Sequence, residues 1–393
     1  MTTPAPEEPA AAPAAHRRLI RLGSVLGVPV FITPSWLLIV IFITVSYAGF
    51  LKDQIPGTSS AGSYALALLF AVALGVSVLL HELGHTVVSR LLGMQVRRIV
   101  VFLLGGVSEI EGEAPRPRDE FAIAAAGPLV SFLLAAGCWG VSQWPDADSA
   151  AGVLLQLVAW SNLVIAVFNV LPGLPLDGGR LVQALIWTFS RSRLTGIRMA
   201  SISGRLVAGL LAVAILWGNV VLTDRHRNDV STLTATILGM AVAGFLWFGA
   251  TQTLRTAELT ARTDNLQLRK LTRPSIYLLA HTPVSEAVRQ ASEARAAGIV
   301  VIDEAGRSRA IVRESDIAGI EQRRRPWMTL AEVSRSLEPG LIIAQDLPGA
   351  AVLQQVRATP ATEYLIVGPD GVSLGVLSIS DLARALGLRH SFN

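Results

Sequence analysis

Residues 69–92 read LFAVALGVSVLLHELGHTVVSRLL, an apolar run long enough to cross a membrane that contains His81, Glu82 and His85. Ionisable side chains are costly in hydrocarbon, so their presence inside a spanning segment indicates a functional site. In a helix, the His-Glu-x-x-His spacing puts both imidazoles on one face, with the carboxylate beside them. The stretch therefore predicts a zinc site that activates water, set inside a membrane helix.

The composition divides the chain into a membrane part and a soluble part. Of the 393 residues, 51% are hydrophobic and 16% are charged, whereas an ordinary soluble domain has about 25% charged residues. We predict a disordered tail over residues 1–22, a membrane domain over 23–255, a linker over 256–267 and a soluble domain over 268–393. The arginines cluster at the ends of apolar runs, so no basic stripe indicates nucleic-acid binding; the expected surroundings are a lipid bilayer.

The expected fold is a polytopic α-helical membrane protein with a membrane-associated β-hairpin. Six spanning helices are predicted at about residues 35–51, 64–92, 121–141, 151–170, 203–222 and 232–252. Residues 94–113 alternate and contain Leu103-Leu104-Gly105-Gly106, which predicts a hairpin with a Gly-Gly turn. Arginines concentrate in the loops on one side, so we expect a multi-pass protein of the cell membrane with both termini in the cytoplasm.

A third metal ligand must come from elsewhere, because catalytic zinc takes three protein ligands and keeps a fourth position for water. The best candidate is Asp177, in the stretch NVLPGLPLDGG at residues 169–179. Its prolines and glycines break a helix at membrane depth, where broken backbone occurs only if it is buried in protein or lines a cavity. A turn that merely favours Asp before Gly is the alternative. Glu82 would be the general base, and Asn169 is predicted to hold substrate backbone, with interhelical hydrogen bonding as its alternative.

These motifs carry a family resemblance. Residues 81–85, Ala126-Gly127-Pro128 and residues 169–179 together resemble the site-2 protease family of intramembrane zinc metalloproteases, over roughly residues 20–250. The resemblance implies one zinc ion per chain, bound by His81, His85 and Asp177, with Glu82 as the base.

The same resemblance implies a kind of substrate. The hairpin with Gly105 and Gly106 is expected to pair with an unwound stretch of a membrane-anchored protein, such as an anti-sigma factor, and Asn169 matches the family's asparagine near the broken helix. Cleavage within or near the substrate's transmembrane segment would be regulated intramembrane proteolysis.

The soluble domain contains two half-repeats of strand, turn, strand and helix, at residues 298–316 and 363–381. Residues 268–393 resemble a tandem pair of CBS (cystathionine-β-synthase-like) modules with an α/β fold. The resemblance implies ATP or another adenine nucleotide at Ser378 and Asp381, regulation of the protease by it, and a homodimer through the CBS domains. A pair without any ligand is an equal alternative, and the first repeat has Arg313 in place of the ribose-binding hydroxyl.

A membrane transporter or channel is the alternative function, because several transport families also carry CBS tails. Transporters contain inverted repeats, and the sequence has no such symmetry. A transporter would also not need a base beside a pair of metal ligands. We therefore expect a zinc-dependent intramembrane endopeptidase.

Overall fold

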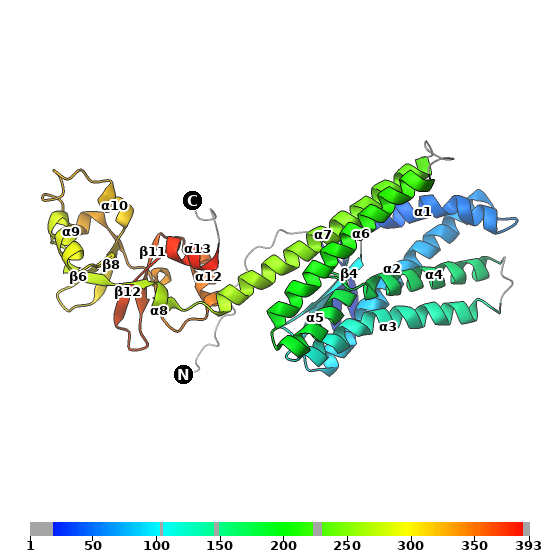
Figure 1. Ribbon diagram of the computed structural model, residues 1–393, viewed down its shortest axis with the longest axis horizontal. Helices are drawn as coiled ribbons and strands as arrows, with labels where there is room; N and C mark the ends of the chain where they lie inside the picture. Colours follow the sequence, from blue (N-terminus) through cyan, green and yellow to red (C-terminus); the bar gives the residue numbers. More distant parts are fainter. Residues whose placement is uncertain (1–18, 103–104, 145–148, 223–229, 388–393) are drawn as a thin grey trace. The chain divides into compact units, whose positions relative to one another are not determined.

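The computed structural model describes residues 19–102, 105–144, 149–222 and 230–387. The chain separates into two compact units, Met1–Leu254 and Arg255–Asn393. The first unit runs from blue to green in Figure 1, and the second runs from green through yellow to red.

Helices make up most of the first unit. They are α1 (Pro34–Gln54), α2 (Ser60–Leu91), α3 (Pro117–Val141), α4 (Ala150–Val170), α5 (Asp177–Ser190), α6 (Arg193–Leu222) and α7 (Val230–Asp264). All except α5 are long and apolar enough to cross a membrane, so the prediction of six spanning helices is confirmed for the described residues. Helix α7 continues to Asp264, which makes most of the predicted linker helical.

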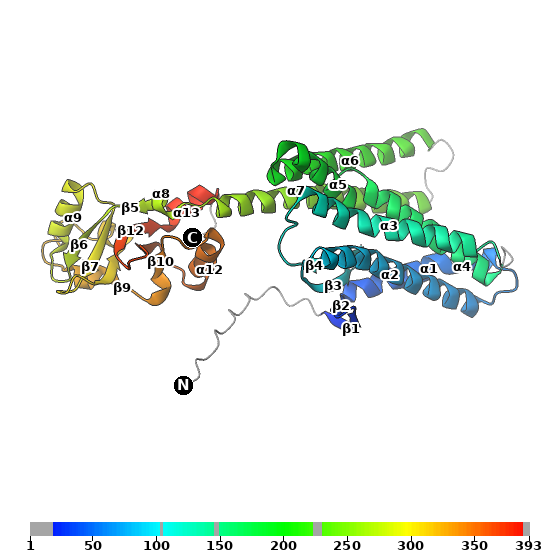
Figure 2. The ribbon, with the colours of Figure 1, turned by 90° about the horizontal axis from the view of Figure 1, so that it is seen from below.

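Helix α3 packs against α2, α4 and α5, and Figure 2 shows it between α6 and α2. Side chains on the outside of the unit are apolar; Leu38 of α1 and Phe248 of α7 are 63% and 62% exposed. Such a surface suits contact with lipid rather than water. By contrast, the side chains of His81 and His85 on α2 are buried inside the unit.

A four-stranded sheet packs against α2 (Figure 2). Its strands are β1 (Ile20–Val25), β2 (Val28–Ile32), β3 (Val96–Phe102) and β4 (Gly105–Ile110), in that order across the sheet. Strands β2 and β3 are parallel, and the other pairs are antiparallel. The predicted hairpin is thus half of a larger sheet, because the chain's N-terminal strands pair with it. The predicted disordered tail is wrong for residues 20–22, which begin β1; residues 1–18 lie outside the described part.

The two hairpin glycines lie in a strand and not in a turn, so the predicted Gly-Gly turn is wrong. Gly105 is opposite Phe102 and Gly106 is opposite Val101 in the β3–β4 ladder. Leu103 and Leu104 lie outside the described residues. Within the described chain, β4 is the last strand of the sheet and pairs only with β3, which leaves its other edge without a strand partner.

The chain between α4 and α5 leaves helical conformation, as the prolines and glycines predict. Residues 171–176 form bends and turns, and the Leu174 N–H donates to the Ala200 carbonyl of α6 at 3.1 Å. Helix α5 begins at Asp177. The break therefore puts Asp177 in the first turn of a new helix that packs against α3 and α6.

The second unit has an α/β fold with two four-stranded sheets. One has the order β6-β7-β8-β9 and the other β10-β11-β12-β5. The strands are β5 (Thr272–Arg273), β6 (Ser275–Leu279), β7 (Gly298–Ile302), β8 (Ser308–Val312), β9 (Ser334–Ser336), β10 (Ile342–Ala344), β11 (Glu363–Val367) and β12 (Ser373–Ser378). The helices are α8 (Leu268–Leu271), α9 (Val284–Glu293), α10 (Glu314–Ala318), α11 (Leu330–Val333), α12 (Gly349–Ala358) and α13 (Ile379–Leu386), with a 3₁₀ turn at Pro339–Leu341.

The two sheets correspond to the two predicted half-repeats, with one exchange between them. Each sheet has its own apolar cluster, and a smaller cluster of Val300, Ile311, Leu365 and Val376 joins the halves. Strand β5 comes first in the sequence of this unit but pairs antiparallel with β12, the last strand. The halves are therefore interleaved and form one unit.

Candidate metal centre

Three ligand atoms from two helices meet inside the first unit. Nε2 of His81 and Nε2 of His85 lie 3.1 and 3.2 Å from Oδ2 of Asp177, and the two nitrogens are 3.3 Å apart. Both histidines are buried, at 5% and 4% exposure. Across the described parts of the chain, this is the one cluster of three such side chains able to hold a metal ion.

The cluster fits a zinc ion by its spacing and by its hydrogen bonds. Ligand atoms bonded to zinc at about 2.0–2.1 Å in a tetrahedron lie about 3.3–3.4 Å apart, close to the separations found here. The Nδ1 of His85 lies 2.7 Å from the Ile123 carbonyl, which can only accept a hydrogen bond. Nδ1 therefore carries the proton, and in the neutral ring Nε2 presents a lone pair to the Asp177 carboxylate. A cation between these acceptors would compensate for their burial.

Helix α3 supports the two imidazoles from behind. The Ser131 hydroxyl lies 2.9 Å from Nδ1 of His81. Gly127, one turn earlier on α3, approaches the rings so closely that an added Cβ would collide with Nε2 of both histidines. Such contacts fix the orientation of the rings, which tunes a bound metal. They give a physical reason for Gly127 in the Ala126-Gly127-Pro128 motif.

Glu82 belongs to α2, and its side chain contacts strand β4 of the hairpin. It is 7% exposed. Its Oε2 accepts a hydrogen bond of 2.8 Å from the Ser108 hydroxyl of β4. Gly106, also of β4, is so close that an added Cβ would lie 2.5 Å from Cγ of Glu82. This close approach is why the glycine belongs in the strand.

An ion pair between half-buried Arg180 and buried Glu120 ties α5 to α3 near the third ligand. Arg180, three residues after Asp177, donates from Nε to Oε1 of Glu120 at 2.8 Å, and Glu120 is 4% exposed. Both side chains line a cavity of about 300 Å³. Because breaking one side of a buried pair leaves an uncompensated charge, the pair holds the helix that carries Asp177 against the helix that supports the histidines.

Comparison with known proteins identifies this part of the chain. The family model of peptidase family M50 matches residues 69–145 and 136–214. The family model of the CBS domain matches residues 268–322. The first unit contains a peptidase family M50 domain. The resemblance drawn from the motifs is confirmed, and all three candidate ligands lie within the matched residues.

Several relatives of the M50 domain are named as zinc metalloproteases. A putative one from Synechocystis sp. is 38% identical over 196 residues, covering 50% of this chain and 51% of that protein. A putative one from Mycobacterium tuberculosis is 37% identical over 199 residues. The chain thus spans about half the length of these two relatives.

Two further similarities come from one organism. A zinc metalloprotease of Methanocaldococcus jannaschii is 24% identical over 371 residues, covering 94% of this chain and 96% of that protein. The solved structure of a site-2 protease from that organism is 28% identical, covers 60% of this chain and 95% of its own, and has a TM-score of 0.42.

The structure brings together most of the residues expected in the M50 domain and adds others. Asn169 is half-buried and donates from Nδ2 to the Ile165 carbonyl of its own helix at 3.0 Å. Ser131 and Ser108 were missed, although the sequence held a signal for each. Ser131 follows Gly127 by one helical turn, and Ser108 follows Gly106 by two strand positions, so each shares a face with a glycine of the site.

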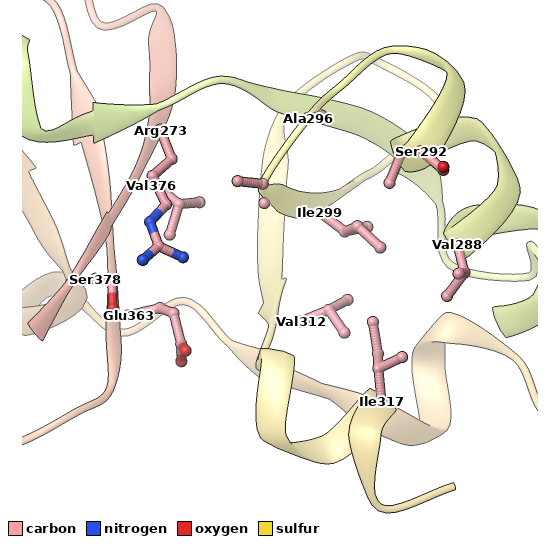
Figure 3. Close-up of a pocket in the computed structure, with 13 residues that line it drawn as sticks. Arg273, Val288, Ser292, Ala296, Ile299, Val312, Ile317, Glu363, Val376 and Ser378 are labelled. Carbon is pink, nitrogen blue, oxygen red and sulfur yellow. The ribbon is translucent and has the colours of Figure 1, made fainter. Parts of the chain in front are cut away.

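The CBS unit contains a cavity of about 290 Å³ (Figure 3). Apolar side chains of the first half, such as Ile299 and Val312, line it together with Glu363 and Ser378 of the second half. Asp381, predicted with Ser378 to contact a nucleotide, is not among its lining residues.

The Asp381 carboxylate is held by two arginines. Its Oδ2 accepts from Nε of Arg273 at 2.7 Å, and its Oδ1 lies 3.3 Å from Arg384. The hydrogen bond from Arg273 lowers the pKa of Asp381. Arg273 itself lines the cavity, where its side chain points toward Glu363 (Figure 3).

Proposed function

We propose that the chain is a zinc-dependent intramembrane endopeptidase that cleaves a membrane-anchored protein within or near its transmembrane segment. The observation that carries this proposal is the buried cluster of His81, His85 and Asp177, with Glu82 next to it on α2. Membrane helices rarely contain such side chains unless they act together at a site.

The chemistry follows from the donor set and from the neighbouring carboxylate. Zinc bound by His81, His85 and Asp177 would polarise a peptide carbonyl and acidify a water molecule. Glu82 would accept the proton of the attacking water and pass it to the leaving amine. Ser131 and the Ile123 carbonyl hold the histidine rings while this occurs.

The substrate would bind as an extended strand. A helix hides its peptide bonds, so the cleaved segment must unwind before water reaches it. The outer edge of β4, which pairs with no other strand among the described residues, offers its backbone groups to such a segment. Gly105 and Gly106 lie at the start of that edge. We assign Asn169 a further contact with substrate backbone. The arginine distribution supports cytoplasmic termini, so cleavage would occur near the cytoplasmic face.

Metal content tests the site. We expect about one zinc ion per chain in the purified wild-type protein and much less in His85→Ala and Asp177→Ala. Zinc that survives Asp177→Ala would contradict the three-ligand assignment. The matched control is Asp119→Ala on α3, a buried carboxylate outside the cluster, which should retain zinc.

Cleavage tests the base and separates a protease from a transporter. Glu82→Gln should retain zinc and lose cleavage, because the amide keeps the shape of the side chain but cannot accept the proton. A variant that still cleaves would rule out Glu82 as the base.

We infer that the CBS cavity takes an adenine nucleotide that regulates the peptidase. The support is its size and its lining, which combines apolar side chains with the Ser378 hydroxyl. Calorimetry of the full chain with ATP should detect binding that weakens in Ser378→Ala and persists in Ser336→Ala, an exposed serine outside the cavity. Equal binding by both variants would refute the role of Ser378. A homodimer through this unit is a further proposal, to be tested by native mass spectrometry.

A further inference from the structure

We propose that Ser108 is a positioning residue for Glu82, an inference that rests on the peptidase function proposed above. The Ser108 Oγ lies 2.8 Å from Oε2 of Glu82 and 3.2 Å from the backbone carbonyl of the same residue. The two residues belong to β4 and α2, so the fold alone brings them together. The serine would fix the orientation of the Glu82 carboxylate.

A short chain of hydroxyl groups directs the Ser108 hydrogen toward Glu82. A serine hydroxyl has one hydrogen to donate and can accept from others. Thr86 of α2, fully buried, donates from Oγ1 to the Ser108 Oγ at 3.2 Å. Ser108 is left to donate, and a bond to a charged carboxylate oxygen is stronger than one to a neutral carbonyl. The order Thr86, Ser108, Glu82 is therefore the favoured direction.

Gly106 restrains the same carboxylate from a second point on β4. An added Cβ would lie 2.5 Å from Cγ of Glu82 and 3.0 Å from its Oε1, so the strand touches the side chain along its length. Residues 106 and 108 are two positions apart and share one face of the strand. A glutamate free of such contacts samples several rotamers, and fixing it in advance removes that entropy from the reaction.

The two contacts also link substrate binding to the base. The free edge proposed to pair with substrate belongs to β4, the strand that carries Gly106 and Ser108. A substrate strand hydrogen-bonded to that edge would restrict the motion of β4. Substrate binding and carboxylate orientation thus depend on one structural element.

The test compares Ser108→Ala with Ser108→Thr, which keeps the hydroxyl, and with Thr86→Val, which removes only the outer donor. The full chain in lipid nanodiscs is given a reporter protein whose single apolar span has a Gly-Pro pair near its cytoplasmic end. We expect kcat to fall about 10–100-fold in Ser108→Ala, with KM and zinc content unchanged. Ser108→Thr should restore most of kcat, and Thr86→Val should lose less than Ser108→Ala.

Several outcomes would overturn the assignment, and each differs from failure of the proposed function. Wild-type kcat in Ser108→Ala, beside an inactive Glu82→Gln, refutes the positioning role alone. Zinc loss in Ser108→Ala would make the serine a support of the metal. Cleavage by Glu82→Gln would instead refute the proposed base. A readout independent of cleavage is a side-chain-resolution structure of Ser108→Ala, where an unmoved Glu82 carboxylate refutes the proposal and a rotated one supports it.

Discussion

Replacing Gly127 with alanine should remove zinc from the M50 domain without unfolding helix α3. The added Cβ would lie 2.5 Å from Nε2 of His81 and closer still to Nε2 of His85. Ordinary contact begins at 3.4 Å, so the His81 ring alone must retreat by about 0.9 Å. Zinc sites tolerate about 0.2 Å of change in ligand distance. Because loss of an outer contact already costs about 10–100-fold, displacement of two ligands should weaken zinc binding by more than about 100-fold.

The assay is competition for zinc against a chromophoric chelator, with purified wild-type protein, Gly127→Ala and Gly137→Ala. Gly137 is the matched control, because it lies on the same helix and an added Cβ there meets nothing within 4 Å. Alanine also favours a helix over glycine by about 1 kcal/mol, so Gly137→Ala should not melt below the wild type. In Gly127→Ala this gain is opposed by overpacking against the two rings, which costs about 1–3 kcal/mol. Zinc affinity in Gly127→Ala equal to that of Gly137→Ala would refute the reasoning.

Three further changes test the site and the CBS unit. Ser131→Ala should weaken zinc binding about 10–100-fold, measured by the same competition, because a ligand ring loses its orienting partner; unchanged affinity would contradict this. Gly106→Ala should lower cleavage with zinc retained, since the Cβ displaces Glu82; normal turnover would show that the strand can move. In the CBS unit, the backbone N–H of Arg307 is the main cause of an Asp303 pKa of about 2, below its ordinary 3.8. Its ionised form therefore stabilises the fold above about pH 4, and this contribution is lost as the pH falls toward 2. Thermal melts of wild type and Asp303→Asn should differ at pH 7 and converge near pH 2, and a constant difference would refute this.

The sequence predicts those parts of the site whose partners are close along the chain. His81, Glu82 and His85 could be assigned because helical spacing alone puts them together. Asp177 could be predicted as a ligand because it follows a break in a membrane helix, and such a break occurs only where the backbone is buried in protein or lines a cavity.

Contacts between distant elements could not be predicted in the same way. The bonds of Ser131 to His81 and of Ser108 to Glu82 join elements 50 and 26 positions apart. The hairpin glycines were misplaced because Gly-Gly is a common turn signal, whereas their actual role depends on the helix that packs against them. Strands β1 and β2 were not predicted to join the hairpin, because a parallel β2–β3 pairing across two helices leaves no local pattern.

The exchange of strand β5 determines when the CBS unit can be completed during synthesis. Its partner β12 ends at Ser378, more than 100 positions later in the chain. The ribosome must therefore release the chain up to Ser378 before this sheet can close, and the M50 domain is made before that point. A nascent or truncated chain that lacks β12 would carry all the proposed zinc ligands but only part of the CBS fold. The unit proposed to regulate the protease is thus complete only in chains that include β12.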